Sequence, residues 1–395
     1  MQTGRSPLLA VLAAAVALLA GCGGGDDPAG PKVAISRVVV AGDSLADVGT
    51  FGGVKFTVQN SADPANGFPV FPQIVAQNFG VNSQCNFFVF TGATFAPNSR
   101  AGCTNFAIGG GRIRNPDAGG GQASPQSVVF QLGAAAQAVG GTYSATDLVL
   151  VDGGGNDSGD LLTAFLGAAA DPQGQGGQRY AAFLAQQLDP ATIAATLPQP
   201  NGAATAAVLY MQKLADTYSG AVKANALDRG ATHVAVLDMP DITLTPRIQA
   251  VFTQVVAPAN GGGAAGAAAA AQVQALMRQW TDAFNARLRA DVGADARVMV
   301  VPFNADFTEE VTHPVDFALS NVTTPACAVV GVTFFDSPAQ AARCTSAALD
   351  ANPPAGLAPG WWQSWTFSDG FHPTPYGHRL LAASTSRALA RAGWL

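Results

Sequence analysis

Residues 37 to 45 read Arg-Val-Val-Val-Ala-Gly-Asp-Ser-Leu. The short β-branched run Arg37–Ala41 ends at Gly42, a pattern typical of a buried strand that leads into a tight turn. Ser44 therefore comes just after the end of a predicted strand. Backbone N–H groups point outward at such a place and favour developing negative charge, so this position suits a nucleophile.

The same kind of run recurs three times along the chain. The further predicted strands are Asp147–Val151, His233–Leu237 and Arg297–Val301. Helix-like segments lie between the runs, over residues 203–227 and 273–292. Because strands alternate with helices, we expect an α/β domain with a mainly parallel sheet covered on both faces.

Two long segments show little periodicity. Residues 51–106 and 304–365 are rich in Pro, Asn, Gly and Phe, and we expect loop-rich insertions that line a cleft. The Gly-rich stretch 260–266 is expected to lead from a surface loop into the helix that contains Trp280. It gives no sign of a second core, so we expect a single domain over residues 36–395.

Composition limits the class of protein. The 395 residues are 48% hydrophobic and only 12% charged, which excludes a chain that is disordered for lack of apolar content. Twenty Lys plus Arg against 26 Asp plus Glu give a net charge of −6. There is no basic excess to neutralise phosphates, so we expect no nucleic-acid partner.

The N-terminus has the features of a processed segment. Residues 1–21 combine a basic start, a short apolar run and small residues, as in a secretory signal peptide. Leu19–Cys22 resembles the lipobox of bacterial lipoproteins, whose cysteine is acylated; a plain secretory peptide is the alternative. We expect residues 22–35 to be a flexible tether and Cys22 to anchor an exported protein in the outer membrane, facing the periplasm or the cell surface.

The cysteines fit an oxidising compartment. Five are present, and setting Cys22 aside leaves an even number in an exported protein. Of the three possible pairings we favour the local one, because short loops close at a modest entropic cost. The expected disulfides are Cys85 to Cys103 and Cys327 to Cys344. No cysteine belongs to a C-x-x-C pair, so we expect no zinc site.

A nucleophilic serine needs a base, and one histidine has a suitable context. His372 lies in a loop rich in Gly and Pro, three residues after Asp369, a spacing that lets one turn bring the carboxylate to the imidazole. A surface Asx-turn with a solvated histidine is the alternative. We expect structural roles for His233 in a strand, His313 in a loop and His378 on an exposed turn at the start of the last helix.

Two Gly-rich segments offer donors for the oxyanion of a tetrahedral intermediate. They cover residues 105–111 and 152–157, and the second follows a predicted strand. Glycine lets backbone N–H groups approach a substrate, and the Asn156 side chain can donate as well. Asp43 and Asp47, beside the serine, are expected to bond nearby backbone groups and shape the turn.

Four blocks together resemble the SGNH hydrolases, also called GDSL esterases and lipases. The blocks are Gly42–Leu45, Asn105–Gly110, Gly154–Asp157 and Asp369–His372. This resemblance implies a three-layer α/β/α sandwich with a flavodoxin-like sheet, acting without a metal or organic cofactor. It implies a catalytic triad of Ser44, His372 and Asp369. It implies an oxyanion hole formed by the Ser44 and Gly110 backbone N–H groups and the Asn156 side chain, with Gly109 as the alternative to Gly110.

Within that family, the nucleophile and histidine blocks look most like the passenger domains of autotransporter esterases. We expect no C-terminal barrel like theirs, and we expect a lipid anchor to replace it as the tether. We expect a monomeric esterase or lipase acting on lipid or short-chain esters. Alternatives are a carbohydrate acetylesterase, a phospholipase, an acyltransferase and an inactive surface-binding lipoprotein. Aromatic residues that would bind an acyl chain or form core are Phe87, Phe88, Phe90, Trp361, Trp362 and Trp365.

Overall fold

A four-stranded parallel sheet forms the centre of the molecule, in the order β1-β4-β5-β6. The computed structural model describes residues 33–114 and 123–395, so the predicted signal peptide and Cys22 lie outside the described residues. The strands are β1 (Arg37–Ala41), β4 (Asp147–Val151), β5 (Val234–Leu237) and β6 (Val298–Val301). All four predicted strands are confirmed, with β5 and β6 each beginning one residue later than expected.

A short extended segment adds a further edge beside β1. The Val40 N–H donates to the Thr104 carbonyl at 2.9 Å, and the Phe106 N–H donates to the Val40 carbonyl at 2.7 Å. The chain therefore leaves β1 toward one side and returns as β4 on the other. That reversal is the topological switch point of a doubly wound sheet, where the carboxyl ends of strands leave a crevice for ligands. Ser44 follows β1, and Asn156 follows β4.

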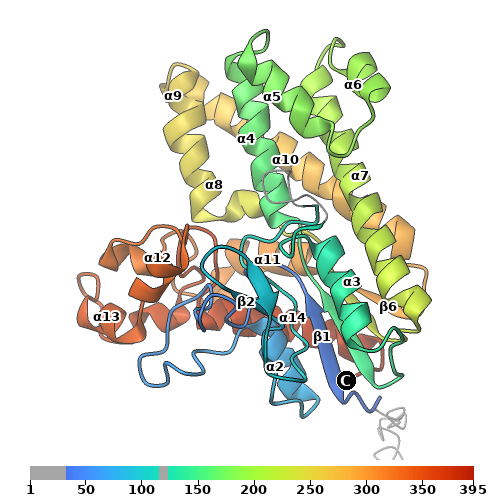
Figure 1. Cartoon of the computed structure of the whole chain (residues 1–395). Coiled ribbons are helices and arrows are strands. Elements are labelled where there is room, and N and C mark those ends of the chain that lie inside the picture. The colour runs from blue at the N-terminus through green and yellow to red at the C-terminus, as the bar shows by residue number, and fades with distance from the viewer. Residues whose placement is uncertain (1–32, 115–122) are drawn as a thin grey trace, which may run out of the picture.

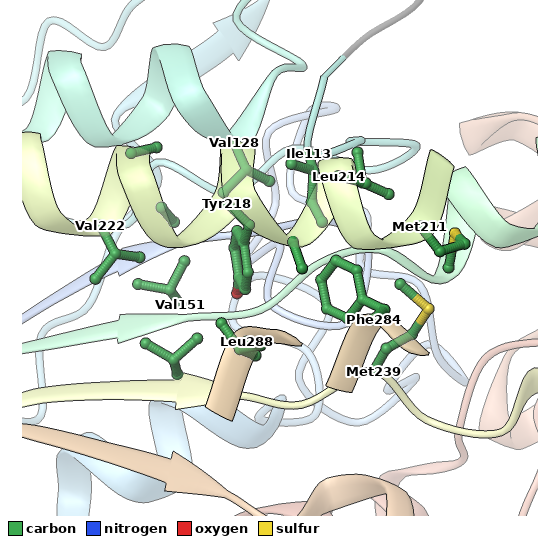
Figure 2. Close-up of a cluster of buried hydrophobic side chains, with 14 of the residues drawn as sticks. Ile113, Val128, Val151, Met211, Leu214, Tyr218, Val222, Met239, Phe284 and Leu288 are labelled. Carbon is green, nitrogen blue, oxygen red and sulfur yellow. The ribbon is translucent and has the colours of Figure 1, made fainter. Parts of the chain in front are cut away.

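Alternate residues of each strand enter two cores on opposite faces of the sheet. One core is covered by α3 (Val128–Ala138), α4 (Gly155–Ala170), α5 (Gln175–Leu184), α7 (Gly202–Asn225) and α10 (Gly263–Val292). The other is covered by α2 (Phe71–Asn78), α11 (Phe303–Thr312) and α14 (Pro375–Arg391). Figure 2 shows part of the first core, where Val151 lies among side chains of α7 and α10 such as Tyr218 and Leu288. The predicted three-layer arrangement is confirmed (Figure 1).

One helix is longer than the sequence indicated. We expected a helix over residues 273–292, preceded by a surface loop, but α10 begins at Gly263 inside the Gly-rich stretch. Residues 264–271 are alanines apart from Gly266, and alanine has the highest helix propensity. Short helices in this half of the chain include α6 (Pro190–Thr196), α8 (Pro246–Val251) and α9 (Ala257–Ala259). No described helix is long and apolar enough to cross a membrane.

The two insertions pack against each other. The first contains α2 and the hairpin of β2 (Phe88–Phe90) and β3 (Phe95–Pro97); the second contains most of α11 and both α12 (Pro338–Arg343) and α13 (Ser346–Ala351). Phe56 and Val58 of the first join a separate apolar cluster with residues of the second. This cluster places both insertions beside the carboxyl edge of the sheet.

Both expected disulfides are present. Cys85 pairs with Cys103 in the first insertion, and Cys327 pairs with Cys344 in the second. The second bridge lies inside the apolar cluster that joins the insertions. Most of the aromatic residues considered for an acyl site are instead core residues: Phe88, Trp361, Trp362 and Trp365 are buried.

Candidate active site

The turn after β1 holds Ser44 in a buried position. The Asp43 carbonyl accepts from the N–H groups of Ala46 at 3.2 Å and Asp47 at 3.1 Å, which closes the turn around the serine. A Cβ on Gly42 would lie 1.6 Å from an Asp152 carboxylate oxygen, so only glycine fits there. Ser44 is 3% exposed.

His372 links the serine to a carboxylate. Its Nε2 lies 2.8 Å from the Ser44 Oγ, and its Nδ1 lies 2.9 Å from the Asp369 Oδ2. Asp369 and His372 come from one loop, as their spacing predicted, whereas Ser44 is 328 residues away in the chain. The structure therefore brings together the three residues that the sequence named. This arrangement can move a proton from the serine hydroxyl to the imidazole.

Asp369 is held by backbone donors on both oxygens. Its Oδ1 accepts from the N–H groups of Phe371 at 2.8 Å and His372 at 2.6 Å, and its Oδ2 accepts from the Phe335 N–H at 2.6 Å. An ionised carboxylate is acceptor-only, which suits a site with four donors. Phe335 belongs to the second insertion, and no local pattern around it indicated this contact.

Four phenylalanines surround the His372 imidazole. Ring centroids of Phe56, Phe334, Phe335 and Phe371 lie 5.3 to 6.0 Å from its own. Phe334 and Phe335 are nearly parallel to the imidazole, at 21° and 20°. Apolar rings around a base exclude water and limit its rotation, which keeps the Nε2 directed at the serine.

Asn156 lies in the first turn of α4, directly after the switch point. Gly154 precedes the helix with φ of 103°, a conformation that glycine adopts without strain. The Asn156 Nδ2 donates to the Gly111 carbonyl at 2.8 Å. An amide nitrogen carries two hydrogens, so a second donor is left for a substrate oxygen.

The structure distinguishes the two glycines proposed as oxyanion donors. The Gly109 N–H donates to the Asp47 Oδ2 at 2.8 Å and is therefore occupied. The Gly109 carbonyl accepts from the Gln126 Nε2 at 3.1 Å. In a trans peptide the following N–H points away from that carbonyl, so Gln126 orients the Gly110 N–H. Among the described residues, the Gly110 N–H has no hydrogen-bond acceptor.

The loop that carries these glycines is clamped to α4. Arg112 forms two hydrogen bonds to the Asp160 carboxylate and donates from Nη1 to the Gly110 carbonyl at 2.6 Å. The Asp157 Oδ2 accepts from the Ile113 N–H at 3.0 Å, and burial raises the pKa of Asp157 to about 7. The sequence did not indicate this clamp, because its partners are far apart in the chain.

The acidic residues beside Ser44 act on the backbone. Asp47 accepts from the N–H groups of Gly49, Thr50 and Gly109, and Asp43 accepts from the Leu45 N–H, as the sequence predicted. Burial raises the pKa of Asp43, and it raises that of Asp152 further. Within residues 33–114 and 123–395 no group of three or more His, Cys, Asp or Glu could hold a metal ion.

The other histidines are not part of this hydrogen-bonded chain, and one differs from its prediction. His378 was expected on an exposed turn but is fully buried in α14, where its Nδ1 accepts from the Phe71 N–H at 3.4 Å. Burial lowers the pKa of His378 to about 3, so the imidazole is neutral. The reason is that α14 packs this turn against α2, which the local sequence does not reveal. His233 packs edge-on against Trp394, and His313 is exposed.

A cleft of about 360 Å³ opens beside these groups, between α4 and α8. Figure 1 shows both helices rising above the sheet. Its lining includes Gly110 and Asn156, together with the apolar side chains of Leu162, Ile248 and Val251. A substrate carbonyl at the free donors would thus extend into a partly apolar cleft.

Comparison with known proteins agrees with this geometry. A search of curated protein sequences finds no match to the chain. A family profile described as GDSL-like Lipase/Acylhydrolase matches residues 38–385. The match spans most of the chain and includes all four sequence blocks that carry the resemblance. The chain therefore belongs to the GDSL-like lipase/acylhydrolase family, within the SGNH superfamily.

Proposed function

We propose that this protein is a serine esterase or lipase that hydrolyses carboxylic esters through an acyl-enzyme. Its family supports hydrolysis of ester bonds in general. The observation that carries the more specific proposal is the continuous hydrogen-bonded chain from Ser44 through His372 to Asp369. Each member has the chemistry that nucleophilic catalysis requires.

In the first half-reaction, Ser44 Oγ attacks the ester carbonyl and passes its proton to His372 Nε2. Asp369 stabilises the imidazolium and keeps Nδ1 protonated. The tetrahedral oxyanion accepts hydrogen bonds from the Ser44 and Gly110 backbone N–H groups and from Asn156 Nδ2. His372 then gives the proton to the leaving alcohol oxygen as the ester C–O bond breaks.

In the second half-reaction, a water molecule attacks the acyl-Ser44 carbonyl. His372 takes a proton from the water and returns it to Ser44 Oγ when the acid is released. The same donors stabilise the second tetrahedral intermediate. A different alcohol in place of water would make the reaction an acyl transfer, so product analysis distinguishes the two outcomes.

The substrate we favour is a lipid or short-chain ester. Support comes from the apolar wall of the cleft, which includes Leu166 and Val251. A carbohydrate acetylesterase is the second enzymatic candidate, favoured by the polar wall formed by Asp160 and Thr163. An inactive binding scaffold is less well supported, because the nucleophile and base are already hydrogen-bonded.

We also propose that Cys22 is lipidated and tethers the enzyme to the bacterial outer membrane. The support is the sequence Leu19–Cys22 and the polar stretch after it, all outside the described residues. Mass spectrometry of the mature N-terminus in the native host tests this. An acylated Cys22 is expected, and an unmodified N-terminus refutes the anchor.

The experiment that tests the enzyme measures hydrolysis of 4-nitrophenyl esters from acetyl to palmitoyl. The chain is expressed from Gly23 onward in an oxidising compartment, beside Ser44→Ala. Activity that is lost in the variant supports the serine esterase, and the dependence on chain length ranks short-chain against lipid substrates. Equal activity in the folded variant and the wild type refutes the proposal.

A further inference from the structure

The active-site cleft contains a guanidinium with no anionic partner. Arg247 lies in the first turn of α8, and its backbone N–H donates to the Gly370 carbonyl at 2.8 Å. Its guanidinium carbon lies 3.5 Å from the centroid of the Phe334 ring. Among the described residues, no carboxylate is within ion-pair distance of this side chain and no acceptor receives its hydrogen bonds. Its donors are therefore available to a ligand.

The other charged groups in the cleft are accounted for differently. Arg112 uses its donors on Asp160 and on the Gly110 carbonyl. Asp160 is therefore paired with Arg112. Asp369 is buried behind the lining and bound to His372, and Asp336 is exposed on the rim with no ion pair among the described residues. Of the two arginines that line the cleft, Arg112 is therefore paired, whereas the guanidinium of Arg247 donates no hydrogen bond to any described residue.

The environment of Arg247 keeps its guanidinium charged. Burial lowers the pKa of Arg247, while the negative charges of Asp369, Asp160 and Asp336 raise it. Arg247 is exposed, so its guanidinium stays charged and hydrated, and a bound anion would replace water at its free donors. The ring of Phe334 fixes its plane, which lowers the conformational entropy lost when a ligand binds.

Arg247 is also placed close to the reacting groups. Phe334 carries the guanidinium on its ring and packs nearly parallel to His372, with centroids 6.0 Å apart. The cation and the base therefore contact the same aromatic ring. The same cleft is lined by Gly110 and Asn156, the donors proposed for the ester carbonyl. An ester bound to those donors has Arg247 within reach of its neighbouring substituents.

We propose that Arg247 binds an anionic group of the ester substrate, a carboxylate or phosphate a few bonds from the scissile carbonyl. The planar guanidinium suits both groups because it can donate two parallel hydrogen bonds to the oxygens of either one. This inference rests on the proposed esterase function and adds a substrate class to it. Arg247 acts in specificity, and the bond-breaking steps stay with Ser44 and His372.

The test compares matched esters that differ in one anionic group. In the first pair the anion is on the alcohol: octanoylglycerol against octanoylglycerol 3-phosphate. In the second it is on the acyl chain: 4-nitrophenyl hexanoate against the mono-4-nitrophenyl ester of adipic acid. For wild type and Arg247→Ala, we measure the ratio of kcat/KM for the anionic ester to that for its neutral partner.

We expect Arg247→Ala to lower this ratio by about 10- to 100-fold in at least one pair, as for a lost charge-assisted hydrogen bond. The pair that responds shows which side of the ester carries the anion. Arg247→Lys keeps the charge but loses the planar fork, so an intermediate ratio is expected. The matched control is Arg379→Ala, which removes another guanidinium stacked on an aromatic ring, at Tyr376 outside the cleft lining, and keeps the wild-type ratio.

Two outcomes separate failure of this inference from failure of the proposed function. If Ser44-dependent hydrolysis occurs but Arg247→Ala leaves both ratios within threefold of wild type, roughly 0.7 kcal/mol, the anion site is refuted and the esterase stands. If the wild type cleaves none of the four esters in a Ser44-dependent way, the proposed function itself fails. A ratio equally low in Arg379→Ala also overturns the assignment, because the effect would then be one of general charge.

Discussion

Replacing Asp369 by Asn tests whether this carboxylate orients the base. The four donors around it come from three backbone N–H groups and the His372 Nδ1. An amide has one acceptor oxygen and one NH₂ donor. If the oxygen takes the Oδ1 position, the NH₂ faces both Phe335 N–H and His372 Nδ1; if it takes the Oδ2 position, the NH₂ faces the other two N–H groups. In the first orientation the imidazole can move its proton to Nε2, so that Nδ1 accepts from the NH₂ and one donor-donor contact remains, at the Phe335 N–H. The second orientation leaves two such contacts, so the first is favoured.

The expected effects follow from those contacts. In the favoured orientation one hydrogen bond to a buried charge is lost, that from the Phe335 N–H, so we expect Asp369→Asn to lower the free energy of unfolding by about 1.5–3 kcal/mol. An NH₂ facing Nδ1 favours the imidazole tautomer with its hydrogen on Nε2. That tautomer cannot accept the Ser44 proton, and kcat should fall by about 10³- to 10⁴-fold.

Urea unfolding and ester hydrolysis measure the two effects separately. Asp316→Asn, an exposed Asp outside the cleft, is the matched control and should change neither quantity. Ser44→Ala should abolish activity while costing about 1 kcal/mol or less of stability. If Asp369→Asn retains folding and a kcat within tenfold of wild type, the carboxylate does not orient the base.

Three further predictions concern residues that the structure singles out. Gln126→Leu removes the donor that orients the Gly110 N–H; kcat should fall by about 10-fold or more with KM little changed in steady-state kinetics, and an unchanged kcat would contradict this role. Burial raises the pKa of Glu310 to about 8, so the native state keeps a proton that the unfolded state loses above about pH 4.5. As pH rises from 5 to 8, the free energy of unfolding of the wild type should therefore fall relative to that of Glu310→Gln, by up to about 1.4 kcal/mol per pH unit. The pKa of His378 is lowered to about 3, so between pH 6.5 and 4 only the unfolded state gains a proton at this residue. As pH falls over that range, the free energy of unfolding of the wild type should therefore fall relative to that of His378→Gln, again by up to about 1.4 kcal/mol per pH unit. Urea titrations of each pair across pH check both slopes, and parallel profiles for wild type and variant would refute them.

Some of the site was accessible from the sequence because it is local. Asp369 and His372 lie in one turn, so their spacing alone predicted that they would meet. The Cys327–Cys344 bridge likewise closes a short loop and was predicted from loop-closure entropy. Which glycine keeps a free N–H was not accessible, because Asp47 and Gln126 reach Gly109 from separate segments.

The sequence by itself determined the four strands and two of the helices between them, α7 and α10. Runs such as Arg37–Ala41 carry β-branched residues and end at turn formers, and that preference acts over a few neighbouring residues. The predicted start of α10 was too late, because the alanines after Gly263 extend the helix into the Gly-rich stretch.

Only the tertiary structure decided how the base is surrounded and which donors remain free. Phe335 reaches Asp369 because two insertions share an apolar cluster, and His378 is buried because α14 packs on α2. The unpaired state of Arg247 likewise depends on which carboxylates lie near it in space. Such contacts join segments up to hundreds of residues apart in the chain. Their energy comes from burial and pairing in the folded state, which the propensities of neighbouring residues do not predict.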